Sequence, residues 1–356
     1  MIRVLIAEDS ITCRDLLIAL CESDSELEVV GTASNGQQAI DMVKQLRPNL
    51  VIMDIHMPVL DGFEATRRIM VERPTPIVIV SATVDVQQAT VSLHALRMGA
   101  LSVLTKPALE PGADFLEVAQ QFTSTIRAMA GVRVVRRWSD RPAYLKDAQP
   151  ARIPPVRMVA IAASTGGPAA LYRVLSELPK DFPVPIAVVQ HIAPGFVPAL
   201  ANWLASASPL VIKVAEHGEA LLPGTVYFAP DDHHLLLADR STLEISARAA
   251  VRGFRPSGTV LFESLAEVYG GGGIGVILTG MGEDGLPGLR ALHAVGGQII
   301  AQDEASSVVF GMPGAAVAAG IADAIVPLNM VAGQLRRMIA GAAGVHGAQG
   351  AHQRRT

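Results

Sequence analysis

The sequence has few cysteines, few aromatic residues and few charged residues. Of its 356 residues two are cysteines, 4% are aromatic and 17% are charged, and the formal net charge is −4. Cys13 and Cys21 fall in one predicted helix and cannot provide a disulfide framework, so we expect core thiols in a reducing compartment. The net charge gives no reason to expect a protein that binds nucleic acid. Half of the residues are hydrophobic, which suits aliphatic parallel sheets covered by helices.

The sequence also lacks the patterns that direct a chain into a membrane. Its first residues, MIRVLIAEDS, do not have the layout of a signal peptide, because acidic residues follow the short apolar run at once. Two long uncharged spans, 192–212 and 305–322, are interrupted by prolines and glycines and make poor membrane helices. We therefore expect a cytoplasmic protein.

Residues 1–125 alternate apolar runs with amphipathic segments, which predicts strands that alternate with helices. The expected strands are 3–7, 27–33, 50–54, 76–81 and 102–105. The expected helices begin near Thr12, Gly36, Gly62, Asp85 and Asp114. Such a series of strand–helix units predicts a doubly wound parallel sheet.

Acidic, hydroxyl and basic residues stand where these strands end. Glu8 and Asp9 follow the first strand, Asp54 ends the third, Ser81 ends the fourth, and Lys106 follows the fifth. Because the carboxyl ends of parallel strands share one edge, these side chains can converge. The carboxylates would repel one another unless a cation such as Mg²⁺ neutralised them, and the lysine and hydroxyl would contact a phosphoryl group carried by one carboxylate. A single acid would more often cap a helix, whereas the ordered set favours a phosphoryl-transfer site.

This first region resembles the receiver domain of two-component response regulators, and the stretch MPVLDG at 57–62 also matches that family. The resemblance implies a flavodoxin-like fold and a histidine kinase as phosphodonor. Val103 departs from the pattern, because many receivers carry there an aromatic residue that moves on activation. The resemblance implies these roles: Asp54 as phosphoacceptor; Glu8, Asp9 and Asp54 as Mg²⁺ ligands; Ser81 as switch hydroxyl; Lys106 as phosphate contact.

The alternation stops at 126–155, where arginines and prolines predict a basic linker, and it resumes in a second domain at 156–340. Short runs separated by Asp and Gly between 224 and 247 predict a hairpin insertion. The last segment, 341–356, is predicted to be a disordered tail. The strands expected in the second domain are 158–163, 185–190, 210–214, 275–279, 298–301 and 324–326.

Three loops of the second domain carry a serine, a histidine and an aspartate after predicted strands. Ser164 begins the turn STGGP, His191 follows IAVVQ, and Asp284 lies in TGMGEDG. These are the parts of a hydrolytic triad, in which serine attacks, histidine relays a proton and aspartate orients the histidine. Each has a commoner explanation when taken singly: a helix cap or phosphate site, a structural histidine, and another cap. The turn lacks both the GxGxxG spacing and the P-loop lysine, so a nucleotide site is the weaker hypothesis.

The second domain resembles the catalytic domain of chemotaxis protein-glutamate methylesterases. The resemblance implies a second doubly wound parallel-sheet domain, a larger Rossmann-like three-layer α/β hydrolase. It implies Ser164 as nucleophile, His191 as general base and Asp284 as orienting carboxylate, with backbone N–H groups near Thr165 and Met281 as oxyanion donors. No cofactor is implied for the esterase reaction. The matching stretches are 162–168, QHIAPGF at 190–196, PGTVYFAP at 223–230, FRPS at 254–257, LTGMGEDG at 278–285 and AQDEASSVVFGMP at 301–313.

The resemblance implies hydrolysis of glutamate methyl esters on the cytoplasmic helices of methyl-accepting chemoreceptors, with release of methanol, and deamidation of glutamines through the same acyl-enzyme. Phosphorylation of the receiver is expected to relieve a block of Ser164. We expect a monomer that reaches membranes only through receptors and binds no nucleic acid. The competing hypothesis is a phosphorylation-regulated receptor- or kinase-binding protein that has lost catalysis.

Three further features of the second domain bear on substrate and metal binding. Arg255 is expected to contact an acidic substrate helix, although an arginine on a loop more often pairs with a surface acid. Gly258 and Thr259 stand where the family commonly has Val-Asp, which predicts a missing acid near the substrate groove. The run at 231–234, Asp-Asp-His-His, is not expected to bind zinc, because adjacent strand residues point to opposite faces.

Overall fold

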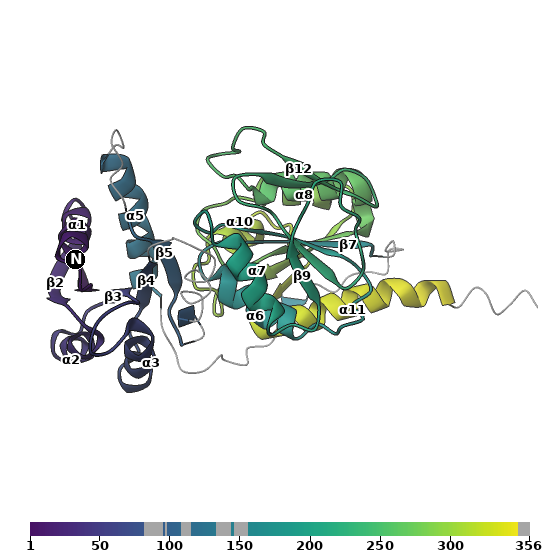
Figure 1. The fold of residues 1–356 in the computed structure, drawn as a ribbon. Coiled ribbons are helices and arrows are strands. Elements are labelled where there is room, and N and C mark those ends of the chain that lie inside the picture. Colours follow the sequence, from purple (N-terminus) through teal and green to yellow (C-terminus); the bar gives the residue numbers. More distant parts are fainter. Residues whose placement is uncertain (82–94, 97, 108–114, 133–143, 146–155, 348–356) are drawn as a thin grey trace, which may run out of the picture. The chain divides into compact units, whose positions relative to one another are not determined.

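The computed structural model describes residues 1–81, 95–96, 98–107, 115–132, 144–145 and 156–347. The chain divides into two compact units, Met1–Trp138 and Ser139–Thr356. Figure 1 shows both, with helices and strands labelled. No helix in these described ranges has the length and apolar character that crossing a membrane requires.

The described part of the first unit is a five-stranded parallel sheet in the order β2-β1-β3-β4-β5. Helices α1 and α5 lie on one face, and α2 and α3 on the other (Figure 1). The doubly wound fold predicted from the sequence is confirmed. The helix expected near Asp85 lies outside the described residues, apart from its last positions. The elements are β1 (Ile2–Ala7), α1 (Ile11–Glu22), β2 (Leu27–Ala33), α2 (Gly36–Leu46), β3 (Leu50–Asp54), α3 (Gly62–Glu72), β4 (Ile77–Ser81), β5 (Ser102–Thr105) and α5 (Phe115–Ala130).

Local sequence explains why these helices begin where they do. The side chains of Ser10, Asn35 and Asp61 each accept a hydrogen bond from an amide in the first turn of the helix that follows. Such caps satisfy N–H groups that have no partner inside the helix. Strands β3 and β4 are buried at every position, as strands covered on both faces must be.

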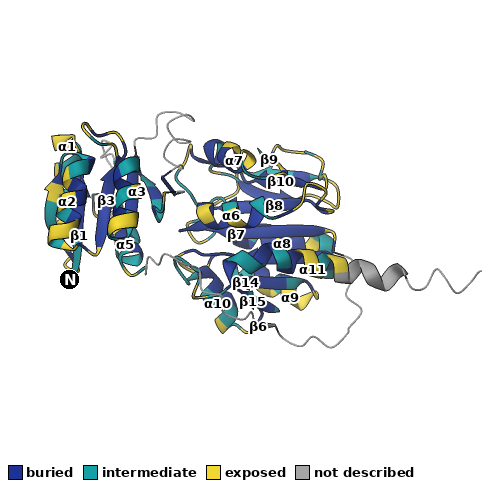
Figure 2. Ribbon diagram, turned by 90° about the horizontal axis from the view of Figure 1, so that it is seen from below, coloured by how far each residue is buried: buried dark blue, intermediate teal, exposed yellow. Residues whose placement is uncertain are grey.

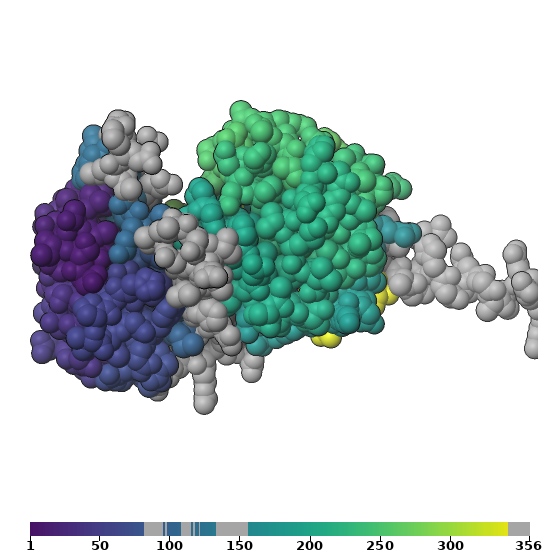
Figure 3. All heavy atoms as spheres, in the orientation of Figure 1, coloured from purple at the N-terminus to yellow at the C-terminus, as the bar shows by residue number. Residues whose placement is uncertain are grey.

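The described part of the second unit has an eight-stranded sheet in the order β6-β15-β14-β13-β7-β8-β10-β9. Every pairing is parallel except that of the edge strand β6. The face of this unit seen in Figure 3 is built mainly from its first half, coloured teal and green. The strands of the sheet are β6 (Tyr144–Leu145), β7 (Met158–Ala163), β8 (Ile186–Gln190), β9 (Val211–Val214), β10 (Thr225–Phe228), β13 (Gly273–Ile277), β14 (Gln298–Gln302) and β15 (Ala324–Val326).

Helices cover both faces of this sheet, so that buried strands lie between helices whose outer sides are exposed (Figure 2). A separate antiparallel pair, β11 (His234–Leu237) and β12 (Leu243–Ser246), packs against α8. The helices are α6 (Gly167–Ser176), α7 (Val197–Ala205), α8 (Gly258–Tyr269), the 3-10 turn η1 (Gly270–Gly272), α9 (Leu286–Ala294), α10 (Met312–Ala318) and α11 (Leu328–Gly347).

The structure differs from the sequence-based prediction at three places. The hairpin predicted between 224 and 247 is only β11–β12, because the fully buried β10 lies inside the main sheet between β8 and β9. The predicted linker overlaps the end of α5 and contains β6. The predicted disordered tail begins within α11, where alanines continue the helix despite glycines that each cost about 1 kcal/mol. Residues 348–356 lie outside the described part of the chain.

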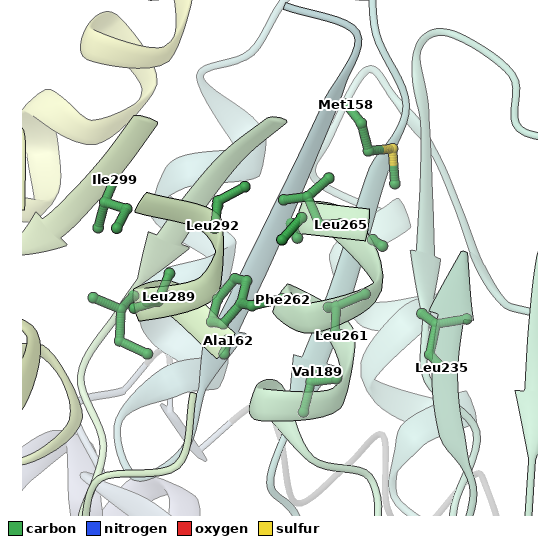
Figure 4. Packing of buried hydrophobic residues seen from close by; sticks show 14 of the residues in the cluster. Met158, Ala162, Val189, Leu235, Leu261, Phe262, Leu265, Leu289, Leu292 and Ile299 are labelled. Atoms are coloured by element: carbon green, nitrogen blue, oxygen red, sulfur yellow. The ribbon is translucent and has the colours of Figure 1, made fainter. Parts of the chain in front are cut away.

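Helix α8 packs closely on the sheet. Its side chains Leu261, Phe262 and Leu265 lie over β7 and beside Leu289 and Leu292 of α9 (Figure 4). A Cβ atom added at Gly258 would lie 2.8 Å from the Cβ of Ala162, so this close approach requires glycine. The packing therefore fixes the amino end of α8 against the carboxyl end of β7, where polar loops meet.

Candidate active site

Ser164, His191 and Asp284 lie on loops that follow neighbouring strands. Ser164 follows β7, His191 follows β8, and Asp284 comes after β13, while β7 lies between β8 and β13. The Ser164 N–H donates to the Thr279 carbonyl at 3.0 Å, and the His191 N–H donates to the Ala163 carbonyl at 2.9 Å. These backbone bonds hold the three loops side by side at one edge of the sheet.

The turn after Ser164 depends on close backbone packing. Gly166 has φ 77°, in the left-handed region, and is followed at once by α6. A Cβ atom added at Gly280 would lie 2.7 Å from the Cβ of Ser164 and 2.4 Å from the sulfur of Met312. Glycine at 280 therefore lets the loop after β13 lie directly against the half-buried serine.

A buried amide joins the serine and histidine loops. Nε2 of Gln190 donates to the carbonyl oxygens of both Ser164 and His191, each at 2.8 Å. Sequence reasoning missed this residue, although its signal was a polar side chain that ends an otherwise apolar strand. Gln190 thus fixes the spacing between the two loops.

His191 contacts Asp284 directly. Its Nε2 lies 3.0 Å from Oδ2 of Asp284, and its side chain is 11% exposed. Both ring nitrogens are buried, and neither meets the geometry of a hydrogen bond with a described residue, so Nε2 and Asp284 form a close polar contact while Nδ1 has no such contact. The phenyl ring of Phe254 stacks on the imidazole, with centroids 4.4 Å apart and planes inclined by 13°. As the ring is oriented, Nδ1 is the nitrogen left to exchange a proton with a reacting group.

The carboxylate of Asp284 is surrounded by donors from the start of α8. Oδ1 accepts from the hydroxyl groups of Ser257 at 2.7 Å and Thr259 at 2.9 Å, and Oδ2 accepts from the Gly258 N–H at 2.6 Å. The Thr259 hydroxyl also accepts from the Gly285 N–H at 2.9 Å. A helix amino end favours negative charge, so Asp284 lies where its ionised form is best stabilised.

These contacts decide the ionisation of Asp284. Burial by itself would raise the pKa of the carboxyl group, but the close contact with His191 and its charge oppose that rise, together with donation from Ser257 and Gly258. The balance holds the pKa of Asp284 well below its ordinary value. The side chain is 1% exposed and stays a carboxylate at neutral pH.

The structure places Gly258 and Thr259 beside Asp284, while the expected absence of an acid near the substrate groove stays a prediction. Both are buried, and their donor groups face Asp284. An N-capping serine at 257 turns these residues inward at the first turn of α8. The departure from the family pattern therefore affects the support of the carboxylate.

The other predicted site residues have defined places. The guanidinium of Arg255 pairs with Asp232, with Nε and NH2 at 2.8 and 2.7 Å from Oδ1, and its NH1 donates to two backbone carbonyls. The N–H groups of Thr165 and Met281 have no acceptor in the described part of the chain. Asp231 accepts from the Gly195 N–H at 3.0 Å.

The first unit has its own polar cluster at the carboxyl edge of its sheet. Carboxylate oxygens of Glu8, Asp9 and Asp54 lie within 4.8 Å of one another. Nζ of Lys106 lies 2.9 Å from Oε2 of Glu8 and 3.0 Å from Oδ2 of Asp54. Ser81 is buried at the end of β4, and its carbonyl accepts from the Lys106 N–H at 2.9 Å. The structure thus brings together the three carboxylates and Lys106, and it places Ser81 at the end of the neighbouring strand β4.

Charge in this cluster is incompletely balanced by the protein. Burial raises the pKa of Glu8, although Lys106 opposes that shift. Burial would lower the pKa of Lys106, but Glu8 and Asp54 together raise it. Among the described residues Lys106 is the cation paired with these carboxylates, and Arg14 donates only to the backbone carbonyl of Glu8, so the three acids fit Mg²⁺, which oxygen ligands bind. Buried Val103 lies on β5 beside Ile79 of β4.

The fold and the two polar clusters define a receiver-type domain joined to a serine-hydrolase-type α/β domain. Family models agree: the CheB methylesterase model matches residues 159–335, and the response regulator receiver domain model matches residues 4–112. A receiver domain is phosphorylated, typically in a reaction that depends on Mg²⁺.

The chain belongs to the family of CheB methylesterases with a receiver domain. It is 52% identical to protein-glutamate methylesterase/protein-glutamine glutaminase 4 of Myxococcus xanthus, over 97% of this chain and 99% of that protein. It is 50% identical to protein-glutamate methylesterase/protein-glutamine glutaminase 3 of Anaeromyxobacter dehalogenans, over 94% and 98%. The CheB methylesterase catalytic domain of Thermotoga maritima aligns with a TM-score of 0.50 and 40% identity, over 51% of this chain and 98% of that one.

Proposed function

We propose that the second unit is a serine hydrolase that demethylates glutamate methyl esters of chemoreceptors and deamidates receptor glutamines. The observation that carries this proposal is the 3.0 Å contact of His191 with Asp284 on loops adjacent to Ser164. The names of the relatives support the same two reactions. The competing hypothesis of a binding protein without catalysis is not favoured, because the serine, histidine and aspartate are all present at one edge.

The acylation step uses Nδ1 of His191, the ring nitrogen that does not contact Asp284. As Oγ of Ser164 attacks the ester carbonyl carbon, Nδ1 of His191 takes the hydroxyl proton, and the carbonyl π electrons move to oxygen. The N–H groups of Thr165 and Met281 are proposed to bind that oxyanion, since both are without other acceptors among the described residues. When the intermediate collapses, the imidazolium returns the proton to the leaving oxygen and methanol departs.

Deacylation repeats these transfers with water. His191 takes a proton from water, the resulting hydroxide attacks the acyl carbon, and Ser164 leaves with the proton, so the product is glutamate. A glutamine follows the same route with ammonia as leaving group. Asp284 stabilises the imidazolium in both steps. Because both of its oxygens already accept hydrogen bonds, the carboxylate does not have to move when the positive charge appears.

The first unit is proposed to control this reaction through phosphorylation of Asp54. The phosphoryl group moves from a phosphohistidine nitrogen of a kinase to a carboxylate oxygen of Asp54. Glu8, Asp9 and Asp54 would hold Mg²⁺, which neutralises charge during the transfer, while Lys106 and Ser81 contact the phosphoryl group. Phosphorylation is proposed to raise access to Ser164.

The partners follow from the proposed reaction. The proposed substrate is the cytoplasmic helical region of a methyl-accepting chemoreceptor, which puts the enzyme in the cytoplasm and brings it to membranes through receptors. That the enzyme is a monomer and binds no nucleic acid stays a prediction. Contact of Arg255 with an acidic substrate helix stays a prediction, because its guanidinium is paired with Asp232 and its side chain is 27% exposed.

A fluorophosphonate probe tests the proposed nucleophile, since it reacts with activated serines. Native protein and Ser176→Ala, a matched change at the far end of α6, are expected to be labelled equally. Ser164→Ala is expected to remain unlabelled. Equal labelling of Ser164→Ala, or no labelling of the native protein even with acetyl phosphate and Mg²⁺, would contradict the assignment.

A further inference from the structure

We infer that Phe254 is a positioning residue that holds the imidazole of His191 between Asp284 and Ser164. The inference rests on the proposed function, because it assigns Phe254 to the same reaction. Phe254 is half-buried, and its ring lies almost parallel to the imidazole, with 4.4 Å between centroids and 13° between planes.

The imidazole needs support on its face as well as at its edge. The contact with Asp284 restrains one edge nitrogen, Nε2, but does not by itself prevent the ring from tilting. A phenyl ring stacked on the face restrains that tilt and does not cover the edge of the ring, where Nδ1 lies. The face of a phenyl ring also attracts a cation, so the stack favours the imidazolium that forms when Ser164 is deprotonated.

Phe254 is itself fixed by a tight turn. Val251 and Phe254 exchange both backbone hydrogen bonds, each at 3.0 Å. The two residues between them are left-handed, with φ 52° at Arg252 and 87° at Gly253, as a type I′ turn requires. The turn is tied to the Asp284 loop, because NH1 of Arg252 lies 2.6 Å from Oε1 of Glu283.

The same segment supports both partners of the His191–Asp284 pair. Phe254 covers the face of His191, and Ser257, three residues later, donates to Asp284 at 2.7 Å. A single short stretch of chain therefore sets the relative position of the imidazole and the carboxylate. This arrangement makes Phe254 a residue that positions His191 for proton transfer, and not only part of the packing of the core.

Substitutions that separate stacking from apolar bulk test this inference. Phe254→Leu keeps an apolar side chain but removes the ring, whereas Phe254→Tyr and Phe254→Trp keep a ring. We expect Phe254→Leu to slow fluorophosphonate labelling of Ser164, and kcat for methanol release, by roughly 10-fold, with KM changed little. Phe254→Tyr is expected to restore most of the native rate. Phe63→Leu, a half-buried phenylalanine of the first unit, is the matched control and should leave the labelling rate unchanged.

A proton NMR spectrum gives a readout that a merely structural role would not move. The proton of His191 Nε2 that faces Asp284 is expected to give a downfield signal in the native protein and in Phe254→Tyr, and to exchange faster with water in Phe254→Leu. If thermal unfolding shows that Phe254→Leu does not fold, Phe254→Met takes its place.

Two results would overturn the inference. One is native labelling and native proton exchange in a folded Phe254→Leu. The other is a raised KM for receptor with an unchanged labelling rate, which would make Phe254 a substrate contact. Failure of the proposed function looks different, because the native protein itself would then not be labelled at Ser164.

Discussion

The two units carry polar clusters at the same kind of place, the carboxyl edge of a parallel sheet, but they balance charge in opposite ways. In the first unit Glu8, Asp9 and Asp54 crowd together with Lys106 as their basic partner. In the second unit a single carboxylate, Asp284, receives hydrogen bonds from hydroxyl and backbone donors and contacts His191.

The cluster of the first unit therefore needs a cation to balance its charge, whereas Asp284 of the second unit is stabilised by protein groups alone. Carboxylates with too few protein donors gain from a cation and respond strongly to a new phosphoryl group. A carboxylate whose oxygens are already bonded keeps its place during proton transfer, which is what preorganised catalysis requires. The carboxyl edge of a parallel sheet therefore carries a phosphorylation switch in the first unit and a hydrolytic reaction in the second.

The largest expected effect is the loss of phosphorylation when Mg²⁺ or the carboxylate of Asp54 is removed. With acetyl phosphate and Mg²⁺, the native protein should become phosphorylated, while Asp54→Asn, or the native protein with EDTA, should show no phosphoprotein. Without a phosphodonor, when Asp54 is unmodified in either case, EDTA should leave fluorophosphonate labelling of Ser164 unchanged. Asp61→Asn, which changes the exposed cap of α3, is the matched control. Loss of serine labelling on chelation would remove the contrast between the two sites.

Next in size is the loss of the orienting charge. Asp284→Asn should lower kcat for methanol release by roughly 10⁴-fold, because the amide cannot stabilise the imidazolium or hold the required tautomer. Asp181→Asn, the same change at an exposed aspartate of the second unit, should stay close to native activity. A decrease below 10-fold in Asp284→Asn would show that the carboxylate is dispensable.

A smaller effect is expected from the support of that carboxylate. Thr259→Val removes a hydroxyl that donates to Asp284 and accepts from the Gly285 N–H. Leaving these buried groups without a partner should reduce the free energy of unfolding by about 1–3 kcal/mol. Urea unfolding measures this loss, and Thr259→Ser, which keeps the hydroxyl, should recover most of it. Equal stability of the two variants would show that the bond contributes nothing.

The smallest effect is a dependence of stability on pH. The pKa of Asp284 lies below its ordinary value of 3.8, so its contribution to stability is complete above that value and is lost as pH falls through the lower, folded-state pKa. One group changes the free energy of unfolding by at most about 1.4 kcal/mol per pH unit. The stability difference between the native protein and Asp284→Asn should therefore shrink below pH ~4. A constant difference would contradict the lowered pKa.

Much of the fold could be predicted from the sequence because buried parallel strands are short, continuous apolar runs. Strand β10 was placed in a hairpin, since a run of its length next to Asp and Gly turns does not reveal which sheet it joins. Strand β6 was missed because a two-residue edge strand has no pattern of its own. Sheet membership is decided by tertiary packing, which periodicity does not encode.

The site could be predicted only in part. The positions of Ser164, His191 and Asp284 after predicted strands indicated these residues. The groups that donate to Asp284 lie at the start of α8, and no local sequence pattern links that helix to the Asp284 loop. Ser257 carried a detectable signal, a serine before an apolar helical run, yet that signal indicates a cap and not a ligand of the carboxylate. The stacking of Phe254 on His191 depends on a turn that only the structure places.

The most direct test of the account is methanol release from methylated chemoreceptor membranes, measured with and without acetyl phosphate and Mg²⁺. The account predicts release that rises with the phosphodonor in the native protein, stays at the unstimulated rate in Asp54→Asn, and is absent in Ser164→Ala. Release from Ser164→Ala at the native rate would contradict the proposed nucleophile, and with it the hydrolytic role of the second unit.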